Sequence, residues 1–313
     1  MQARAVIFEG NQKLSVGDLP LIEPSKDDLV VDVHWSGVST GTERLLWASE
    51  MPMFPGLSYP LVPGYEAVGT VRQARGDPSR VGETVFVPGG HCFKGAAGLF
   101  GASATRLVVP ADRCIPLDHA PCEEDVLLAL AATAHHAIQA SMPPQLIVGH
   151  GVVGRLMARI TLALGYDAPT VWEINPDRRL GANYPVLSPD ADPRKDYASI
   201  CDVSGSVQVL DDIIAHSEKG ATIVLAGFYS DRPNFAFPAA FMREITLKIA
   251  AEWTPEDIGA VQALRVSGAL SFDGLVTHAR TPGDADAAYR TAFGDPSCLK
   301  MVLDWREFHD HAH

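Results

Sequence analysis

The stretch Leu146-Ile147-Val148-Gly149-His150-Gly151-Val152-Val153-Gly154 joins a short apolar run to a G-x-G-x-x-G turn, and helix-like apolar spacing continues from Arg155 to Leu164. Each glycine has a physical role: Gly149 permits the tight strand-to-helix turn, Gly151 lets the backbone approach a pyrophosphate, and Gly154 lets helix and strand pack closely. The N-terminus of the helix offers free N–H groups to an anion. The whole turn, residues 149–154, is therefore predicted to bind a dinucleotide.

A carboxylate that holds the adenosine ribose is expected roughly 20 residues farther along, at the end of the next strand. Glu173, within Thr170-Val171-Trp172-Glu173-Ile174-Asn175, is at that place. A carboxylate there accepts hydrogen bonds from two ribose hydroxyls and repels a 2′-phosphate, so Glu173 favours NAD over NADP. Arg178 and Arg179 follow and could instead meet a 2′-phosphate, which keeps NADP open as an alternative.

Length, charge and cysteine usage are typical of a cytoplasmic enzyme. A chain of 313 residues is long enough for about two domains, each with its own core. The net charge of −13 disfavours nucleic acid and anionic membrane surfaces as partners. We expect neither a signal peptide nor stable membrane insertion, since no apolar run is long enough. Five cysteines without C-x-x-C spacing are expected to be reduced thiols.

The pattern of apolar residues changes along the chain. The first 118 residues or so contain short β-type runs between Gly and Pro clusters, at Ala5–Phe8, Leu29–His34, Ala67–Val71, Thr84–Val87 and Thr105–Val109. Helices and strands then alternate: helix 124–140, strand 145–148, helix 152–164, strand 170–174, strand 198–203, helix 207–216 and strand 222–225. This alternation predicts an α/β fold with a doubly wound parallel sheet. A helix is expected over 255–266, and short strands and turns over 275–305.

This layout, together with four segments, resembles the medium-chain dehydrogenase/reductase family. The segments are Ser36–Glu43, similar to the first active-site loop; Tyr59–Gly69, similar to P-x-x-x-G-H-E-x-x-G; Ala131–Ile138, similar to the helix that enters the cofactor domain; and Gly274–His278, similar to the returning strand. The resemblance implies a GroES-like substrate domain at residues 1–120, a Rossmann NAD-binding domain at 121–269, and a return to the first domain at 270–313. The family often forms dimers through edges of the cofactor domain, so a homodimer is possible.

The departures from the family concern its zinc. In the zinc-using members a Cys, His, Cys triad holds the catalytic metal, and its positions fall here on Ser39, Tyr65 and Ala129. These residues are not a competent zinc ligand set. The four-cysteine structural lobe is missing as well, so we expect a zinc-independent enzyme. His91-Cys92 with Glu66 or His136 could form a substitute site, but adjacent residues point in different directions and seldom chelate one ion.

Oxidation of an alcohol without zinc still needs a group that takes the hydroxyl proton. The candidates are Tyr65, Thr40, Thr42, Glu66 and the nearby histidines. Tyr65 is the first choice because its position points into the active site of the zinc enzymes, and a phenol can pass a proton along a relay. The alternative is a tyrosine that only fills the volume of the missing metal.

The resemblance also implies three cofactor contacts beyond the glycine turn. Thr133 matches a threonine that lies against the nicotinamide, and Ala226-Gly227-Phe228 matches the backbone segment that receives the carboxamide. Lys300 matches a basic residue near the pyrophosphate, although it could equally be a solvated surface lysine.

The stretches Gly41–Trp47 and Met51–Glu66 resemble more closely a zinc-independent branch of the family. This similarity implies NAD-dependent oxidation of the hydroxyethyl group of a chlorin pigment, a chlorophyllide or bacteriochlorophyllide, to an acetyl group in bacteriochlorophyll synthesis. A flat, apolar macrocycle needs a wide cleft lined by aromatic and adaptable side chains. Candidate contacts are Trp47, Met51, Met53, Phe54 and Tyr59, with Ser39, His91 and His136 as polar members. The apolar residues could instead form the packed underside of a loop.

Two other functions are alternatives to the oxidation of a chlorin pigment. A zinc-free quinone or enone reductase using NAD(P)H would share the fold and the missing ligands, although Glu173 weighs against NADPH. A non-catalytic dinucleotide sensor would explain the lost metal triad, but Thr133 and the polar loop weigh against it.

Overall fold

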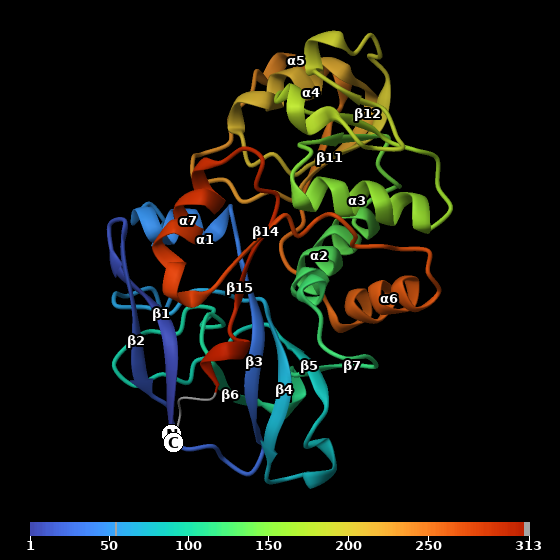
Figure 1. The fold of residues 1–313 in the computed structure, drawn as a ribbon. Helices are drawn as coiled ribbons and strands as arrows, with labels where there is room; N and C mark the ends of the chain where they lie inside the picture. Colours follow the sequence, from blue (N-terminus) through green and yellow to red (C-terminus); the bar gives the residue numbers. More distant parts are fainter. Residues whose placement is uncertain (54, 310–313) are drawn as a thin grey trace. The chain divides into compact units, whose positions relative to one another are not determined.

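The chain divides into two compact units in the computed structural model, which describes residues 1–53 and 55–309 (Figure 1). The first unit comprises Met1–Leu128 and the chain from Asp273 onward, and the second comprises Ala129–Phe272. The boundaries differ by a few residues from the predicted 120 and 269. The 3₁₀ helix η3 (Glu123–Leu127) packs against strands β3 (Asp28–Val38) and β4 (Ala67–Ala74), and this contact places it in the first unit.

The first unit is rich in β-structure, as the sequence predicts. Its remaining strands are β1 (Gln2–Gly10), β2 (Lys13–Pro20), β5 (Thr84–Val87), β6 (Arg106–Pro110), β7 (Ile115–Leu117), β14 (His278–Arg280) and β15 (Met301–Asp304). Strands β1 and β2 form a hairpin, and the others form a sheet in the order β14-β15-β3-β4-β5-β7, with β6 paired to β3. Strand β15 runs antiparallel to β3, with Met301 opposite Val38. The last strand of the chain thus lies in the sheet of the first unit.

Two helices of the first unit differ from the sequence expectations. Helix α1 (Thr42–Ala48) begins inside the segment predicted as a loop, so Thr42 and Glu43 lie in its first turn. Helix α7 (Ala285–Gly294) occupies part of the tail that was expected to hold only strands and turns. Its buried side chains, Ala285, Ala288, Tyr289 and Ala292, follow a helical spacing that small alanines and flanking Gly and Pro residues conceal. Figure 1 shows α7 beside α1, where the rings of Trp47 and Phe293 lie 5.5 Å apart.

The second unit contains a six-stranded sheet that is parallel throughout. Its strands are β8 (Leu146–Val148), β9 (Thr170–Trp172), β10 (Val186–Leu187), β11 (Tyr197–Asp202), β12 (Ser217–Leu225) and β13 (Thr246–Ile249), in the order β10-β9-β8-β11-β12-β13. The chain winds from β8 toward one edge and then from β11 toward the other. The predicted doubly wound fold is therefore confirmed, and its topological switch point lies between β8 and β11.

Helices cover both faces of this sheet. They are α2 (Leu128–Gln139), α3 (Val152–Ala163), α4 (Leu210–His216), α5 (Phe237–Arg243) and α6 (Pro255–Val266). Figure 1 shows β11 and β12 between α3 on one side and α4 with α5 on the other. Leu156 and Ile160 of α3 are wholly buried, and each contributes on the order of 1.5–3 kcal/mol of apolar burial. This packing fixes the helix whose N-terminus follows the glycine turn.

Shorter 3₁₀ helices connect these elements, at η1 (Pro78–Arg80), η2 (Ala111–Arg113), η4 (Pro176–Arg179), η5 (Pro189–Ala191), η6 (Val207–Val209), η7 (Pro282–Asp284) and η8 (Arg306–Phe308). Among residues 1–53 and 55–309, every helix is too short or too polar to cross a lipid bilayer.

Candidate functional site

The glycine turn has the geometry that a dinucleotide requires. Gly149 has φ +101°, which disfavours any residue with a side chain. A Cβ on Gly154 would overlap the carbonyl oxygen of Gly149, so only glycine permits this close approach of helix and turn. A Cβ on Gly151 would meet nothing within 4 Å. Gly151 caps α3 without any side-chain hydrogen bond to the first turn, which suits an anion.

Glu173 lies directly beside this turn. Its side chain is buried, with Oε2 accepting the N–H of His150 at 3.2 Å and Oε1 accepting the N–H of Asn175 at 2.8 Å. The strand order explains the contact, because β9 is the neighbour of β8 and both end at the same edge of the sheet. The predicted proximity of Glu173 to the turn is confirmed, whereas its contact with a ribose stays a prediction.

The imidazole of His150 holds the segment that follows Glu173. It is wholly buried, and its Nδ1 lies 2.7 Å from the carbonyl oxygen of Arg178, which can only accept. Nδ1 therefore carries the hydrogen, and Nε2 accepts from the hydroxyl of Tyr184 at 2.9 Å. Burial, with help from Arg155, lowers the pKa of His150 to about 4. The backbone of His150 is thus part of the turn, while its neutral ring binds Arg178 and Tyr184 and stabilises the fold.

The two arginines after Glu173 are tied to backbone carbonyl groups. The guanidinium of Arg179 donates to the carbonyl oxygens of Glu173 and Ile174, each at 2.8 Å. The carbonyl of Arg178 accepts from His150 and, at 2.8 Å, from Arg155. Arg179 is therefore engaged within its own loop, which weakens the argument that it meets a 2′-phosphate.

The other predicted cofactor residues of the second unit lie where strands and helices end. The N–H groups of Ala226 and Gly227 donate to the carbonyl oxygen of Asp202 at 2.9 and 3.1 Å. A Cβ on Gly227 would lie 2.8 Å from the backbone nitrogen of Gly205, and Phe228 is about half exposed. Thr133, on α2, donates its hydroxyl to the carbonyl of Ala129 at 3.0 Å. Contacts of these residues with a nicotinamide stay predictions.

In the first unit, the two residues at the zinc-ligand positions bind each other. The hydroxyl of Tyr65 donates to Oγ of Ser39 at 2.7 Å, and the Tyr65 ring packs edge-on against Phe100. A serine, a tyrosine and the methyl group of Ala129 provide neither thiolate, imidazole nor carboxylate, so the residues present do not fit zinc. Burial strongly raises the pKa of Tyr65. Tyr65 is therefore a neutral phenol at ordinary pH.

Glu66 and Lys300 form a buried ion pair in the first unit. The ammonium of Lys300 binds Oε2 of Glu66, and both side chains are at most 1% exposed. A Cβ on Gly37 would overlap the Glu66 carboxylate, so glycine is required there. Burial raises the pKa of Glu66, and Lys300 opposes that rise. The alternative of a solvated surface lysine is wrong, because burial of an ammonium requires the partner that Glu66 supplies. A contact between Lys300 and the pyrophosphate stays a prediction.

The sequence interpretation missed Glu43. This side chain is fully buried in the first turn of α1, where its Oε1 accepts the N–H of Ser39 at 3.0 Å and its Oε2 has no hydrogen-bond partner. Burial raises the pKa of Glu43 to about 8. Nearby, the hydroxyls of Tyr289 and Ser103 lie 3.3 Å apart. An acid early in a short helix is normally exposed, so no sequence pattern announced this burial. Thr40 and Thr42 flank the group and are partly buried.

Most of the predicted pigment contacts pack inside the first unit. Trp47, Met51 and Tyr59 lie against its core, and the Tyr59 hydroxyl donates to the carbonyl of Leu46. This arrangement supports the alternative of a packed loop underside for these three. Met53 is 97% exposed, and Phe54 lies outside the described residues. Contacts of all five with a pigment stay predictions.

The histidines considered for a substitute metal site belong to different units, His91 to the first and His136 to the second. His91 is exposed while Cys92 is buried, as expected for adjacent residues that point in different directions. On α2, Nδ1 of His135 and Nδ1 of His136 bind the two carboxylate oxygens of Asp257 at 2.7 and 2.9 Å. His136 thus has a structural partner within the second unit, and its contact with substrate stays a prediction.

Another group of potential ligands, His119, Cys122 and Asp125, has ligand atoms within 4.8 Å of one another. Its carboxylate accepts from His119 at 2.9 Å and from the N–H of Cys122 at 3.1 Å. The bond from Cys122 belongs to the capping box that begins η3, so Cys122 and Asp125 have a structural explanation.

Comparison with known proteins relates this chain to alcohol dehydrogenases. Residues 25–119 match the alcohol dehydrogenase GroES-like domain. The chain is 53% identical to 2-desacetyl-2-hydroxyethyl bacteriochlorophyllide A dehydrogenase of Rhodobacter capsulatus, over 98% of this chain and 99% of the relative. It is 50% identical to the protein of the same name from Cereibacter sphaeroides, with the same coverage of 98% and 99%.

Solved structures share the fold at low sequence identity. A short chain alcohol dehydrogenase from Escherichia coli, complexed with NADH, has a TM-score of 0.82 at 19% identity, over 97% of this chain and 99% of that one. A dehydrogenase from Sinorhizobium meliloti bound to NADP has a TM-score of 0.80 at 17% identity, with the same coverage of 97% and 99%. The fold therefore accommodates either dinucleotide.

Proposed function

Because the chain belongs to the family of 2-desacetyl-2-hydroxyethyl bacteriochlorophyllide A dehydrogenases, within the medium-chain dehydrogenase/reductase superfamily, we propose that it oxidises the hydroxyethyl group of a chlorophyllide or bacteriochlorophyllide to an acetyl group. The observation that carries the proposal is the similarity to two relatives that are named for this dehydrogenase. They are 53% and 50% identical to this chain, each over 98% of its length. The product acetyl group is conjugated with the macrocycle, whereas the starting alcohol is not.

NAD is the proposed oxidant, and its nicotinamide accepts the hydride that leaves the carbinol carbon. The backbone of residues 149–154 would hold the pyrophosphate at the open side of Gly151, and Glu173 would hold the ribose. The choice of NAD over NADP is supported by the buried carboxylate of Glu173 and by Arg179, whose guanidinium is tied to its own loop.

Proton transfer is proposed to proceed without zinc. The alcohol hydroxyl would hydrogen-bond to Tyr65, which already donates to Ser39. Because burial keeps Tyr65 protonated, Tyr65 would donate its own proton to Ser39 while it accepts the proton of the alcohol. Glu66 is unsuited as the acceptor, since its carboxylate is neutralised by Lys300. Thr40 and Thr42 would supply further hydroxyls beside this relay.

An absorbance assay tests the proposal. Purified protein is mixed with NAD and a hydroxyethyl bacteriochlorophyllide, and the pigment spectrum is followed as the conjugated acetyl group forms. We expect the red-shifted product spectrum together with stoichiometric NADH. No change with this pigment, combined with NADPH-dependent reduction of simple enones, would instead identify a quinone or enone reductase.

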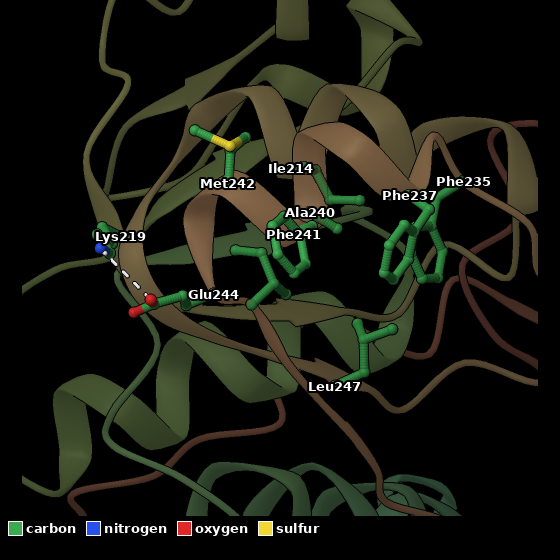
Figure 2. A pocket seen from close by; sticks show the side chains of 10 residues that line it. Ile214, Lys219, Phe235, Phe237, Ala240, Phe241, Met242, Glu244 and Leu247 are labelled. Atoms are coloured by element: carbon green, nitrogen blue, oxygen red, sulfur yellow. Dashed lines mark ion pairs between the residues drawn. The ribbon is translucent and has the colours of Figure 1, made fainter.

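We further propose that the protein is a cytoplasmic homodimer, joined through the edge of the second unit. Strand β13 is the last strand of the sheet, and all four of its residues are exposed, with Ile249 at 75%. Beside it, Phe237, Phe241 and Met242 of α5 project from the surface (Figure 2). They border a hollow of about 420 Å³ whose rim carries the ion pair of Lys219 and Glu244.

An exposed apolar edge strand is a liability unless another chain covers it. A two-fold axis beside β13 would pair the two identical strands antiparallel and extend the sheet across both copies. The cytoplasmic location is supported by the five cysteines, all of which are free thiols.

A further inference from the structure

Two buried carboxyl groups of the first unit differ in their counterions. Glu66 is neutralised by the ammonium of Lys300. Within residues 1–53 and 55–309, no salt bridge joins a cation to Glu43, although that side chain is fully buried. Burial of an ionised carboxylate without a cation is costly, so a proton compensates instead. Glu43 is therefore a buried group that can hold or release one proton.

The carboxyl of Glu43 is anchored at Oε1, and the Tyr289 hydroxyl also interacts with this carboxyl. Oε1 accepts the N–H of Ser39 at 3.0 Å, while Oε2 has no hydrogen-bond partner. The groups that face it come from several elements: Ser39 before α1, Thr42 on α1, Tyr65 and Glu66 before β4, Tyr289 on α7 and Lys300 before β15. Burial is the main cause that raises the pKa of Glu43 to about 8; the Ser39 N–H and Lys300 oppose the rise, and repulsion from Glu66 adds to it. This pKa lies within the range where enzymes work.

Ser39 connects Tyr65 with this carboxyl through two hydrogen bonds, one at its hydroxyl and one at its backbone N–H. The hydroxyl of Tyr65 donates to Oγ of Ser39 at 2.7 Å. A serine hydroxyl that accepts one hydrogen bond still has its own hydrogen to donate. Ser39 also places its backbone N–H on Glu43. One residue thus contacts both the phenol proposed to meet the substrate and the buried acid.

We propose that Glu43 is the positioning residue that holds Ser39 and finally receives, through the Ser39 and Tyr65 hydroxyls, the proton that the substrate alcohol loses. The inference rests on the proposed dehydrogenase function. In the balanced step, the alcohol O–H bond breaks and its proton passes to Tyr65, the Tyr65 proton passes to Ser39, and the Ser39 proton passes to the Glu43 carboxylate. The C–H bond breaks in the same oxidation, and its hydride goes to the oxidised nicotinamide.

The pH profile of Glu43→Gln is the main test. Glutamine keeps an oxygen that accepts the Ser39 N–H but cannot take up a proton. In the wild type, kcat for pigment oxidation should rise with pH and level off once Glu43 is ionised. In Glu43→Gln this rise should disappear, and kcat at about pH 9 should fall roughly 10²-fold with KM little changed. The exposed Glu9→Gln change is the matched control and should leave both unchanged.

Difference infrared spectroscopy of the cofactor-free protein gives a second test that needs no turnover. At about pH 6 the wild type should show the carbonyl band of a buried protonated carboxyl, which fades as the pH passes through the pKa of Glu43. The band should be missing from Glu43→Gln. Absence of the band in the wild type, or a Glu43→Gln enzyme with the wild-type pH profile and rate, would overturn the inference. A protein that shows the band but leaves the pigment unchanged would refute the proposed substrate while supporting Glu43 as the proton-holding group.

Discussion

At the scale of single residues, the three glycines of the turn are needed for different reasons. Gly149 requires its positive φ, and Gly154 requires the absence of a Cβ against the carbonyl of Gly149. Gly151 requires neither within the protein, since it has φ −72° and faces open space. The space beside Gly151 is where the pyrophosphate lies in our proposal.

Alanine substitutions should separate these roles. Gly154→Ala forces an overlap in a well-packed place and should lower the free energy of unfolding by about 1–3 kcal/mol, measured by urea denaturation. Gly151→Ala should leave stability nearly unchanged but weaken NADH binding, measured by the fluorescence of bound NADH. If Gly151→Ala binds NADH as tightly as the wild type, the pyrophosphate does not approach this position.

Glu173 offers a second prediction at this scale. A hydrogen bond to a charged group contributes about 1.5–3 kcal/mol, so Glu173→Ala should weaken NAD binding roughly 10- to 100-fold. NADP should be affected much less, because the variant also loses the charge that repels the 2′-phosphate. Isothermal titration with both dinucleotides measures the two affinities, and the exposed Asp177→Ala is the control. Equal losses for NAD and NADP would refute the ribose assignment.

At the scale of elements, the edge strand β13 and helix α5 present one apolar face. Phe237 and Phe241 stack with their ring centroids 5.7 Å apart, yet both remain well over half exposed. Single exposed apolar residues are normal on a protein surface, whereas a contiguous apolar face of this kind marks an interaction site. Its place beside the last strand of the sheet, whose outer edge has no strand partner among the described residues, favours a sheet continued into a second copy.

A charge on β13 should separate the dimer. Ile249→Lys places an ammonium group in the proposed interface and should give a monomer by size-exclusion chromatography with light scattering. Val266→Lys alters an equally exposed apolar residue, at 82%, on α6 and should leave the dimer intact. A wild-type protein that is monomeric at micromolar concentration, or a dimer unaffected by Ile249→Lys, would contradict the proposed interface.

The helices also show where apolar periodicity in the sequence is sufficient to predict a helix and where it is not. Helices α3 and α6 follow their predicted bounds closely, because large apolar residues mark the buried face or Pro and acids mark the first turn. Helix α7 was missed because its buried face consists mostly of alanines, which the hydrophobic pattern hardly registers. Helix α1 was missed because its first turn buries Glu43, a residue type that periodicity assigns to the surface.

At the scale of the whole molecule, the proposed zinc-independent mechanism concerns the polar cluster of the first unit. The hydrogen bond between Tyr65 and Ser39 joins two of the zinc-ligand positions, and Glu66 with Lys300 forms a buried ion pair. The charges of Glu66 and Lys300 balance each other without a metal.

Removal of metal should therefore leave the enzyme active. Dialysis against a chelator, followed by dialysis into metal-free buffer, should change neither the rate of pigment oxidation nor the melting temperature. Elemental analysis of the active enzyme checks the metal content, with a zinc-dependent alcohol dehydrogenase as the positive control for stripping. Turnover that disappears on stripping and returns with stoichiometric zinc would refute the zinc-independent mechanism.

The sequence by itself determined the doubly wound sheet, the glycine turn and the position of Glu173 beside it, because these depend on local spacing and on the fixed order of strands in such a sheet. The tertiary structure alone decided the electrostatics of the polar cluster. Lys300 reaches Glu66 across 234 positions of sequence, and Glu43 comes to lie among Ser39, Tyr289 and Glu66 only after α1 and α7 have packed. Burial and partners set the charge of a side chain, and both are properties of the folded chain that no local pattern of residues contains.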